Sequence, residues 1–327
     1  MDNQTYIVSS SPHIHKNESI SSIMLDVLIA LIPAALAGIF FFGYRAAMVI
    51  LTAMASCIVS EYLYEKLLKQ RVTVRDLSAL VTGLLLGLNL PSTIPLWMVV
   101  VGSVFAIIIV KQLFGGLGKN FMNPALAARC FMLIAWAGAM TTFAIPFAKS
   151  GADAIASATP LAILKGTSQG TLPTVANLFL GIKAGSIGET SCLLLLLGFL
   201  YLLVRRVIDW KIPVSFIGVF AVLTFLFGKT PHDYTYTLSH ILSGGLFLGA
   251  FFMATDYTTT PTTPLGQYLF GIGCGILTFV IRQFGGYPEG VSFSIILMNL
   301  VTPLIDRYTM PRKFGEVSGF VRKKTIS

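Results

Sequence analysis

Residues 83–95 read GLLLGLNLPSTIP, a glycine- and leucine-rich run followed by a break that contains proline and threonine. A related pattern occurs later, where GLFLG at 245–249 leads to the break DYTTTPTTP at 256–264. Beyond the two breaks, apolar runs end in QLFGG at 112–116 and in RQFGG at 282–286. These patterns predict an internal repeat, in which the second copy is eight residues longer at its break.

The chain around these patterns is too apolar for a soluble protein. Of its 327 residues, 55% are hydrophobic and 11% are charged, whereas a soluble domain carries about 25% charged residues. The mean hydropathy is +0.79. The net charge of +9 comes from short clusters between apolar runs, whereas a nucleic-acid-binding protein gathers its basic residues on one face. This composition excludes a disordered chain, a disulfide scaffold, an ordinary soluble enzyme and a nucleic-acid partner.

Ten apolar segments approach the roughly 20 residues that a helix needs to cross a bilayer. They lie at 22–43, 45–64, 77–92, 94–113, 123–145, 190–206, 211–228, 238–254, 264–282 and 289–306. We therefore expect an all-α polytopic membrane protein with about ten transmembrane helices. Each repeat copy occupies the third and fourth segments of a group of five, and an odd number of spans per group inverts the second group. Inverted five-helix repeats place a binding site near the middle of the membrane, often at broken helices.

The distribution of Lys and Arg residues indicates the orientation, because basic residues favour the cytoplasmic side. Sixteen of the 23 lie on the side of the N-terminus, six lie on the opposite side, and Arg129 lies within a span. Both termini are therefore expected in the cytoplasm. The expected organisation is a cytoplasmic N-terminal segment at 1–21, a first five-span half at 22–145, an extracytoplasmic loop at 146–189, a second five-span half at 190–306 and a cytoplasmic basic tail at 307–327.

The breaks at 89–95 and 256–264 are candidates for an ion path. Non-helical backbone at membrane depth is tolerated only inside protein or along a water-filled cavity. Asp256 in the second break and Asp26 at the cytoplasmic end of the first span are the acidic residues best placed to contribute a charge. The alternatives are ordinary interfacial loops for the breaks and hydrated or helix-capping roles for the two acids.

The stretch GGLGKNFMNPALAARCF at 115–131 connects the fourth and fifth spans. Asn123 and Pro124 predict the N-cap and first position of a helix, and helix N-termini favour anions. Arg129 would then lie at membrane depth, where a charge is costly and marks a functional site by default. Asn123 and Arg129 are therefore candidate residues for a phosphate or another anion. A tight turn at the glycines and a structural ion pair of Arg129 are the alternatives.

The sequence KSGADAIASATPLAILKG at 149–166 belongs to the only long hydrophilic segment between the spans. Its small residues are typical of a linker, and Thr159 has no base beside it that would make it a nucleophile by itself. The four cysteines lie in or beside apolar segments without C-x-x-C spacing, and the four histidines are scattered. We therefore expect no metal site and no catalytic residue in this chain.

At 153–161 the sequence DAIASATPL resembles the flavin-attachment motif of membrane redox subunits, in which an Asp precedes a small residue, Ala and an acceptor Thr. The commoner motif has Gly where this chain has Ser157. The whole chain is similar to the D-subunit family of Rnf ion-translocating electron-transport complexes. The matching stretches are SSPHIH at 10–15, GLLLGLNLP at 83–91, GGLGKNFMNPALAARCF at 115–131, SATPL at 157–161 and FFMATDYTTTP at 251–261.

This resemblance implies a flavoprotein of the bacterial cytoplasmic membrane, with FMN joined through its phosphate to the Thr159 hydroxyl by a separate flavin transferase. The surrounding motif residues would be Asp153, Ser157, Ala158, Pro160 and Leu161. It further implies a subunit, not catalytic alone, of a complex that passes electrons between ferredoxin and NAD while moving Na⁺ or H⁺. Its partners would be the A-, B-, C-, E- and G-type subunits. A further non-covalent riboflavin in the membrane part fits the family, and no residues are assigned to it.

Two other functions fit parts of the sequence. The homologous B subunit of Na⁺-pumping NADH:quinone reductases is the nearest relative of this family, but it usually carries a longer N-terminal region than residues 1–21 provide. A channel or transporter without a redox role is the alternative from another class, because five-plus-five inverted repeats are common among transporters. Such a protein has no reason to carry the SATPL sequence at 157–161.

Overall fold

The computed structural model describes residues 19–147 and 158–311, which form helices and connecting loops without a β-strand. The first group comprises α1 (Ile20–Phe42), α2 (Tyr44–Leu67), the 3₁₀-helix η1 (Val74–Asp76), α3 (Ser78–Leu88), α4 (Leu96–Val104), the π-helix η2 (Phe105–Gln112), α5 (Pro124–Ala135) and α6 (Ala137–Thr141). Three short helices follow: α7 (Pro160–Lys165), α8 (Val175–Leu180) and the 3₁₀-helix η3 (Ile187–Glu189). The last group comprises α9 (Cys192–Val204), α10 (Lys211–Phe227), α11 (Tyr234–Leu242), α12 (Leu246–Leu248), the π-helix η4 (Gly249–Met253), α13 (Pro264–Phe284) and α14 (Val291–Thr309).

The starts of several helices follow directly from local sequence. The Asn123 Oδ1 atom accepts a hydrogen bond from the Ala125 N–H at 3.0 Å, and Pro124 is the first residue of α5. The predicted cap is therefore confirmed. Thr263 and Pro264 begin α13 in the same way, because a capping side chain satisfies a free N–H group and proline needs none.

Every one of the ten predicted apolar segments contains helix, but segment 238–254 is not one straight helix. Within it, α11 and the combined α12–η4 helix meet at 63°. The bend lies at Ser243–Gly245, where Gly244 has a φ of +71°, a conformation that glycine adopts without steric cost. The apolar segment predicted here is therefore bent in the structure, with the bend inside the segment.

Several helices have the length and apolar composition of membrane spans. The helices α1, α2 and α13 each qualify alone, and the bent α11–α12 pair adds a fourth candidate. Shorter apolar helices accompany them, namely α3, α4 with η2, α5, α9 and α10. Large apolar side chains remain exposed along α1, among them Leu36 and Phe40, as expected for a surface that faces lipid. The described part of the chain is therefore all-helical and has the apolar helices of a polytopic membrane protein.

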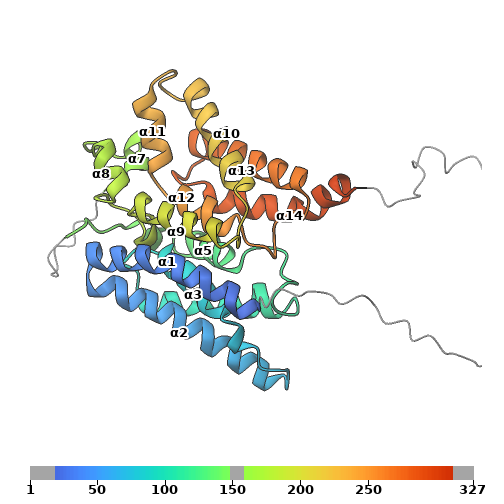
Figure 1. The fold of residues 1–327 in the computed structure, drawn as a ribbon. Helices are drawn as coiled ribbons and strands as arrows, with labels where there is room; N and C mark the ends of the chain where they lie inside the picture. The colour runs from blue at the N-terminus through green and yellow to red at the C-terminus, as the bar shows by residue number, and fades with distance from the viewer. Residues whose placement is uncertain (1–18, 148–157, 312–327) are drawn as a thin grey trace, which may run out of the picture.

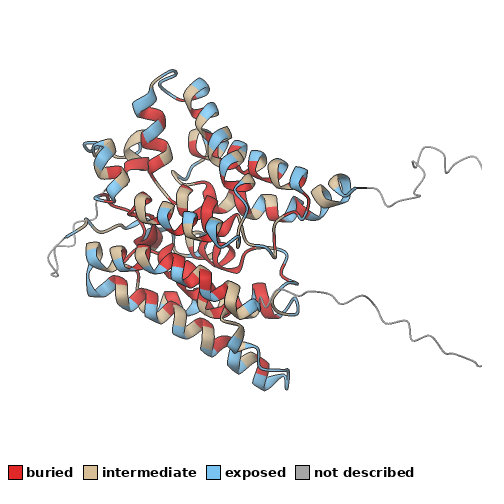
Figure 2. Cartoon of the chain, in the orientation of Figure 1, coloured by how far each residue is buried: buried red, intermediate tan, exposed pale blue. Residues whose placement is uncertain are grey.

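The helices form two groups that meet along a buried centre. In Figure 1, α1, α2 and α3 lie on one side, α10, α13 and α14 lie on the other, and α5, α9 and α12 lie between them. The buried residues gather in this middle region (Figure 2). Contact between α1 and α9 is close at Gly198, where an added Cβ would lie 2.3 Å from the Ala30 carbonyl oxygen.

Candidate functional site

The Thr159 side chain lies at the start of the short helix α7. Its Oγ1 atom accepts a hydrogen bond from the Ala162 N–H at 3.3 Å, and Pro160 follows as the first helical residue. Thr159 is half-buried, whereas Pro160 and Leu161 are buried. The sequence Thr-Pro therefore begins a helix here and leaves the threonine at its edge.

Helix α7 is fastened to two distant loops by lysine side chains. The Lys165 Nζ atom donates hydrogen bonds to the carbonyl groups of Gly285 and Tyr287, both in the loop between α13 and α14. The Lys229 Nζ atom, in the loop between α10 and α11, donates to the Lys165 carbonyl at 2.5 Å. These bonds hold Thr159 against the second group of helices.

A pocket opens beside Thr159 and extends to the buried centre of the molecule. Its polar lining residues include Thr141, Thr159, Arg129, Lys183, Glu189, Glu289 and Ser292. The aromatic rings of Tyr287 and Phe293 also line it, and they lie 6.1 Å apart and nearly parallel, at 22°. The pocket therefore combines two cationic side chains, two carboxyl groups and flat apolar surface with several hydroxyl groups, including that of Thr159.

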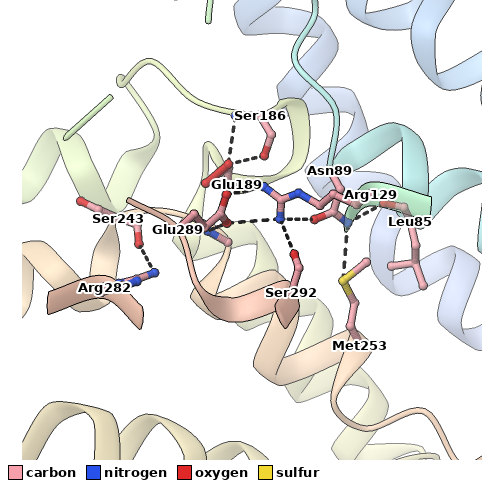
Figure 3. A network of polar contacts seen from close by, with 11 residues as sticks. Leu85, Asn89, Arg129, Ser186, Glu189, Ser243, Met253, Arg282, Glu289 and Ser292 are labelled. Atoms are coloured by element: carbon pink, nitrogen blue, oxygen red, sulfur yellow. Dashed lines mark hydrogen bonds and ion pairs between the residues drawn. The ribbon is translucent and has the colours of Figure 1, made fainter. Parts of the chain in front are cut away.

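Arg129 on α5 is the centre of the polar network in this pocket (Figure 3). Its Nη1 atom donates to Asn89 Oδ1 at 3.0 Å and to Ser292 Oγ at 3.0 Å. Both of its terminal nitrogens contact the Glu289 carboxylate, Nη1 at 3.2 Å and Nη2 in a short ion pair. A buried arginine needs this compensation, because an unpaired buried charge is strongly unfavourable.

The same ion pair connects the ends of two interrupted helices. Asn89 is the C-cap of α3, at the start of the first predicted break. Glu289 Oε1 accepts a hydrogen bond from the N–H of Gly245 at 2.9 Å, and Gly245 is the N-cap of α12. The Arg129–Glu289 pair therefore bridges the end of α3 and the beginning of α12.

Glu189 is the second carboxyl group of the pocket, and it lies outside the membrane-spanning helices in η3. Burial raises the pKa of Glu189, and the adjacent Glu289 carboxylate raises it further. Glu289, in contrast, pairs with the Arg129 guanidinium, and a neighbouring positive charge favours the ionised form of a carboxyl group. Of the two carboxyl groups, Glu289 is therefore the one that stays ionised, and Glu189 is the one that retains a proton more readily.

Two further cations explain why the backbone can break at Ser243–Gly245. The Arg282 guanidinium donates to the carbonyl groups of His240 at 2.6 Å and Ser243 at 3.1 Å. The Lys183 ammonium donates to the carbonyl of Leu242. Carbonyl groups freed at a helix break need such partners inside a membrane protein, and these come from residues far away in the sequence.

Most of the described residues singled out from the sequence line one of three pockets. Thr159, Pro160, Leu161 and Arg129 line the pocket described above. Asn123 and Asp256 line a different pocket between α1, α3, α9 and η4. Ala158 lines a third pocket, which shares Pro160 and Lys183 with the first. Asp153 and Ser157 lie outside the described residues.

The two candidate acids of an ion path have protein partners. Asp26 forms an ion pair with Arg205 at 3.1 Å and accepts a hydrogen bond from the Tyr201 hydroxyl at 2.8 Å. These contacts join α1 to α9. The two carboxylate oxygens of Asp256 accept hydrogen bonds from the N–H and the hydroxyl group of Thr258, at 3.2 and 3.1 Å.

Sequence reasoning did not identify Glu289 as a site residue. The only local signal was an acidic residue in the short sequence YPEG at 287–290. Within 19–147 and 158–311, no group of three or more His, Cys, Asp or Glu side chains could hold a metal ion. All four cysteines are buried and free.

Fold and site together define an all-helical membrane-type protein in which a loop threonine lies beside a buried arginine–glutamate pair. The chain belongs to the NQR2, RnfD, RnfE family, whose model matches residues 7–315. The family resemblance inferred from the sequence motifs is thereby confirmed.

Relatives with assigned names are similar over nearly the whole chain. The D subunit of the Na(+)-translocating ferredoxin:NAD(+) oxidoreductase complex of Acetobacterium woodii is 49% identical over 318 residues, which cover 96% of this chain and 97% of that protein. The D subunit of the proton-translocating ferredoxin:NAD(+) oxidoreductase complex of Clostridium ljungdahlii is 48% identical over 319 residues, covering 95% and 96%. The D subunit of the ion-translocating oxidoreductase complex of Yersinia pseudotuberculosis is 39% identical over 350 residues, covering 95% and 99%.

Proposed function

We propose that this protein is the D subunit of an Rnf-type complex that couples electron transfer between ferredoxin and NAD to ion transport, and that it carries FMN covalently on Thr159. The observation that carries the flavin assignment is the position of Thr159. This threonine of the SATPL sequence lines a pocket that is also lined by cationic and aromatic side chains. The other subunits of such a complex and a flavin transferase would be its partners. The long matches to D subunits favour this assignment over the B subunit of a quinone reductase.

The residues of the pocket fit a flavin attached to Thr159. Thr159 is half-buried, lines the pocket and precedes the first residue of α7, so we expect that its hydroxyl group can be esterified without unfolding this helix. Arg129 and Lys183 supply positive charge for a phosphate, and Tyr287 and Phe293 supply flat surface for an aromatic ring system. When bound, the flavin supplies the redox chemistry, and the protein positions it and adjusts its environment.

We further propose ten spans in two inverted halves, with the divisions at 1–21, 22–145, 146–189, 190–306 and 307–327 and with both termini in the cytoplasm. The packing of α1 against α9, the first helices of the two halves, supports this arrangement. Helices α7 and α8 also lie at the opposite end of the molecule from the end of α14 (Figure 1). Thr159 would then face the outside of the bacterial cytoplasmic membrane.

The coupling ion does not follow from similarity, because relatives at 49% and 48% identity are named for Na⁺ and for protons.

For the ion path we propose Asp256, which lines the pocket between the two groups of helices. Asp26 is the weaker candidate, since Arg205 and Tyr201 already satisfy its carboxylate. A channel without redox function is the competing proposal, and a flavin on this chain would eliminate it.

Peptide mass spectrometry tests the attachment directly. Trypsin cleaves after Lys149 and Lys165 and releases the peptide 150–165, which contains Thr159, Ser150 and Ser157 as the hydroxyl residues. We expect this peptide to carry the mass of FMN less one water, with fragment ions that place it on Thr159. An unmodified peptide from the assembled complex, or modification of either serine, would contradict the proposal.

A further inference from the structure

We propose that the Arg129–Glu289 ion pair sets the redox potential of the flavin on Thr159. We further propose that the pair couples the charge of the flavin to the conformation of the protein at the end of α3 and at the start of α12. This inference rests on the proposed function. Its basis is geometric, because Thr159 and both members of the pair line one pocket. The same two side chains hydrogen-bond to Asn89 at the end of α3 and to Gly245 at the start of α12.

The pair can act on the potential because it is largely removed from water. The side chains of Arg129 and Glu289 are 9% and 20% exposed, and charges interact more strongly where water is excluded. A flavin that takes up two electrons, from reduced ferredoxin or another electron donor, together with one proton from water gains one negative charge. Arg129 favours that charge and Glu289 opposes it, so the two residues act with opposite signs.

The link to the helices follows from the shared hydrogen bonds. Arg129 also donates to Ser292 at the start of α14. A new negative charge in the pocket competes with Glu289 for the guanidinium, and therefore changes the contacts that Asn89 and Gly245 receive. A charge shifts a conformational equilibrium only when it interacts differently with the two conformations. This pair provides a contact through which that can happen at the end of α3 and at the bend between α11 and α12.

A second buried ion pair shows that burial alone does not create this arrangement. Lys111 and Glu61 are 2% and 0% exposed and form a short ion pair. Their further hydrogen bonds go to Ser78 and Gln112, within the first group of helices. This pair does not line the pocket of Thr159 and has no place in the proposed coupling.

Redox titration of the purified complex tests the potential. In the flavin-loaded fraction of each variant, we expect Arg129→Gln to lower the midpoint potential of the covalent flavin and Glu289→Gln to raise it. Each shift should correspond to at least a tenfold change in the reduction equilibrium, which is about 30 mV for a two-electron couple. Arg129→Lys, which keeps the charge, and Arg205→Gln, which breaks the more exposed α1–α9 ion pair, should leave the potential near the wild-type value. Unchanged potentials, or shifts of the same sign in the two glutamine variants, would overturn the inference.

Hydrogen exchange on the wild-type complex gives an answer even if the variants do not fold. We expect dithionite reduction to change the exchange of amides at the end of α3 and at Gly245, and to have no such effect in Thr159→Ala, which lacks the acceptor. Equal exchange in the oxidised and reduced flavin-loaded protein would refute the link to the helices. If the wild-type protein carries no covalent flavin at all, the proposed function itself fails, and the two failures are therefore distinguishable.

Discussion

The Lys165 Nζ atom donates a hydrogen bond to the backbone carbonyl of Tyr287 at 2.9 Å. This bond connects the helix that begins at Thr159 with the loop that carries Glu289, although the two residues are 122 positions apart. This bond therefore helps to fix the position of Thr159 relative to the Arg129–Glu289 ion pair.

Replacing Lys165 should weaken the attachment of α7 to the loop between α13 and α14. Lys165→Met removes two hydrogen bonds from a charged donor, each worth about 1.5–3 kcal/mol in a buried site and less here because Lys165 is partly exposed. We expect normal membrane insertion, a lower yield of covalent flavin per protein and faster chymotrypsin cleavage within 158–185. Lys119→Met, at an exposed lysine in another loop, is the control. Equal flavin yield and equal cleavage rates in the two variants would show that α7 is held by other contacts.

The raised pKa of Glu189 predicts a specific dependence of stability on pH. Burial, followed by the Glu289 carboxylate, raises this pKa above the ordinary value of 4.5, so the folded state binds the proton more tightly than the unfolded state. The contribution to stability is complete below pH 4.5 and is lost as the pH rises through the raised pKa. Each unit by which the pKa is raised corresponds to about 1.4 kcal/mol.

Thermal unfolding in detergent between pH 4.5 and pH 8 measures this contribution. In Glu189→Gln the amide oxygen can still accept the hydrogen bonds from Ser186, and no carboxyl group titrates. We therefore expect the variant to lose less stability than the wild type as the pH rises. Parallel curves for the two proteins would mean that Glu189 is ionised in the folded state throughout.

Cysteine labelling tests the orientation. The four native cysteines are buried, so a single introduced cysteine reports on its own position. Gln169 and Gln70 are both exposed and lie in loops at opposite sides of the proposed membrane. We expect an impermeant maleimide added to intact cells to label Gln169→Cys and to leave Gln70→Cys unlabelled until the membrane is opened. The reverse pattern would place Thr159 in the cytoplasm and overturn the topology.

Asp256→Asn tests the ion path. If the Asp256 carboxylate contributes to cation movement, its loss should reduce ion transport more than electron transfer in vesicles that contain the complex. Asp209→Asn, at an exposed acid with 56% of its side chain accessible, controls for a general loss of negative charge. An unchanged ratio of ions to electrons would leave Asp256 as a structural residue that orients Thr258.

The local features of this fold could be predicted from the sequence. The apolar segment predicted at 264–282 corresponds to α13 (Pro264–Phe284), and the Asn123–Pro124 cap begins α5 as expected. Both features depend only on residues that are close in the sequence, because hydropathy and capping residues determine each helix separately. The bend at Gly244 could not be predicted, because its free carbonyl groups are satisfied by Arg282 and Lys183, which are distant in the sequence.

The candidate site was predictable only in part for the same reason. Thr159 and Arg129 each carried a local signal, a motif for one and a charge at membrane depth for the other. That they line the same pocket, and that Glu289 lies 160 positions from its partner Arg129, depends on tertiary packing. Asn123, although close to Arg129 in the sequence, lines a different pocket.

The central claim, a flavin on Thr159, is tested most directly by in-gel flavin fluorescence of two threonine variants. Thr159 and Thr174 each cap a six-residue helix in the region between the two groups of helices, so replacing either with alanine removes a comparable cap. We predict that Thr159→Ala abolishes the fluorescence of this protein on a denaturing gel, while Thr174→Ala retains it at the wild-type level. Fluorescence that persists in Thr159→Ala, at equal amounts of protein in the membrane, would contradict the account.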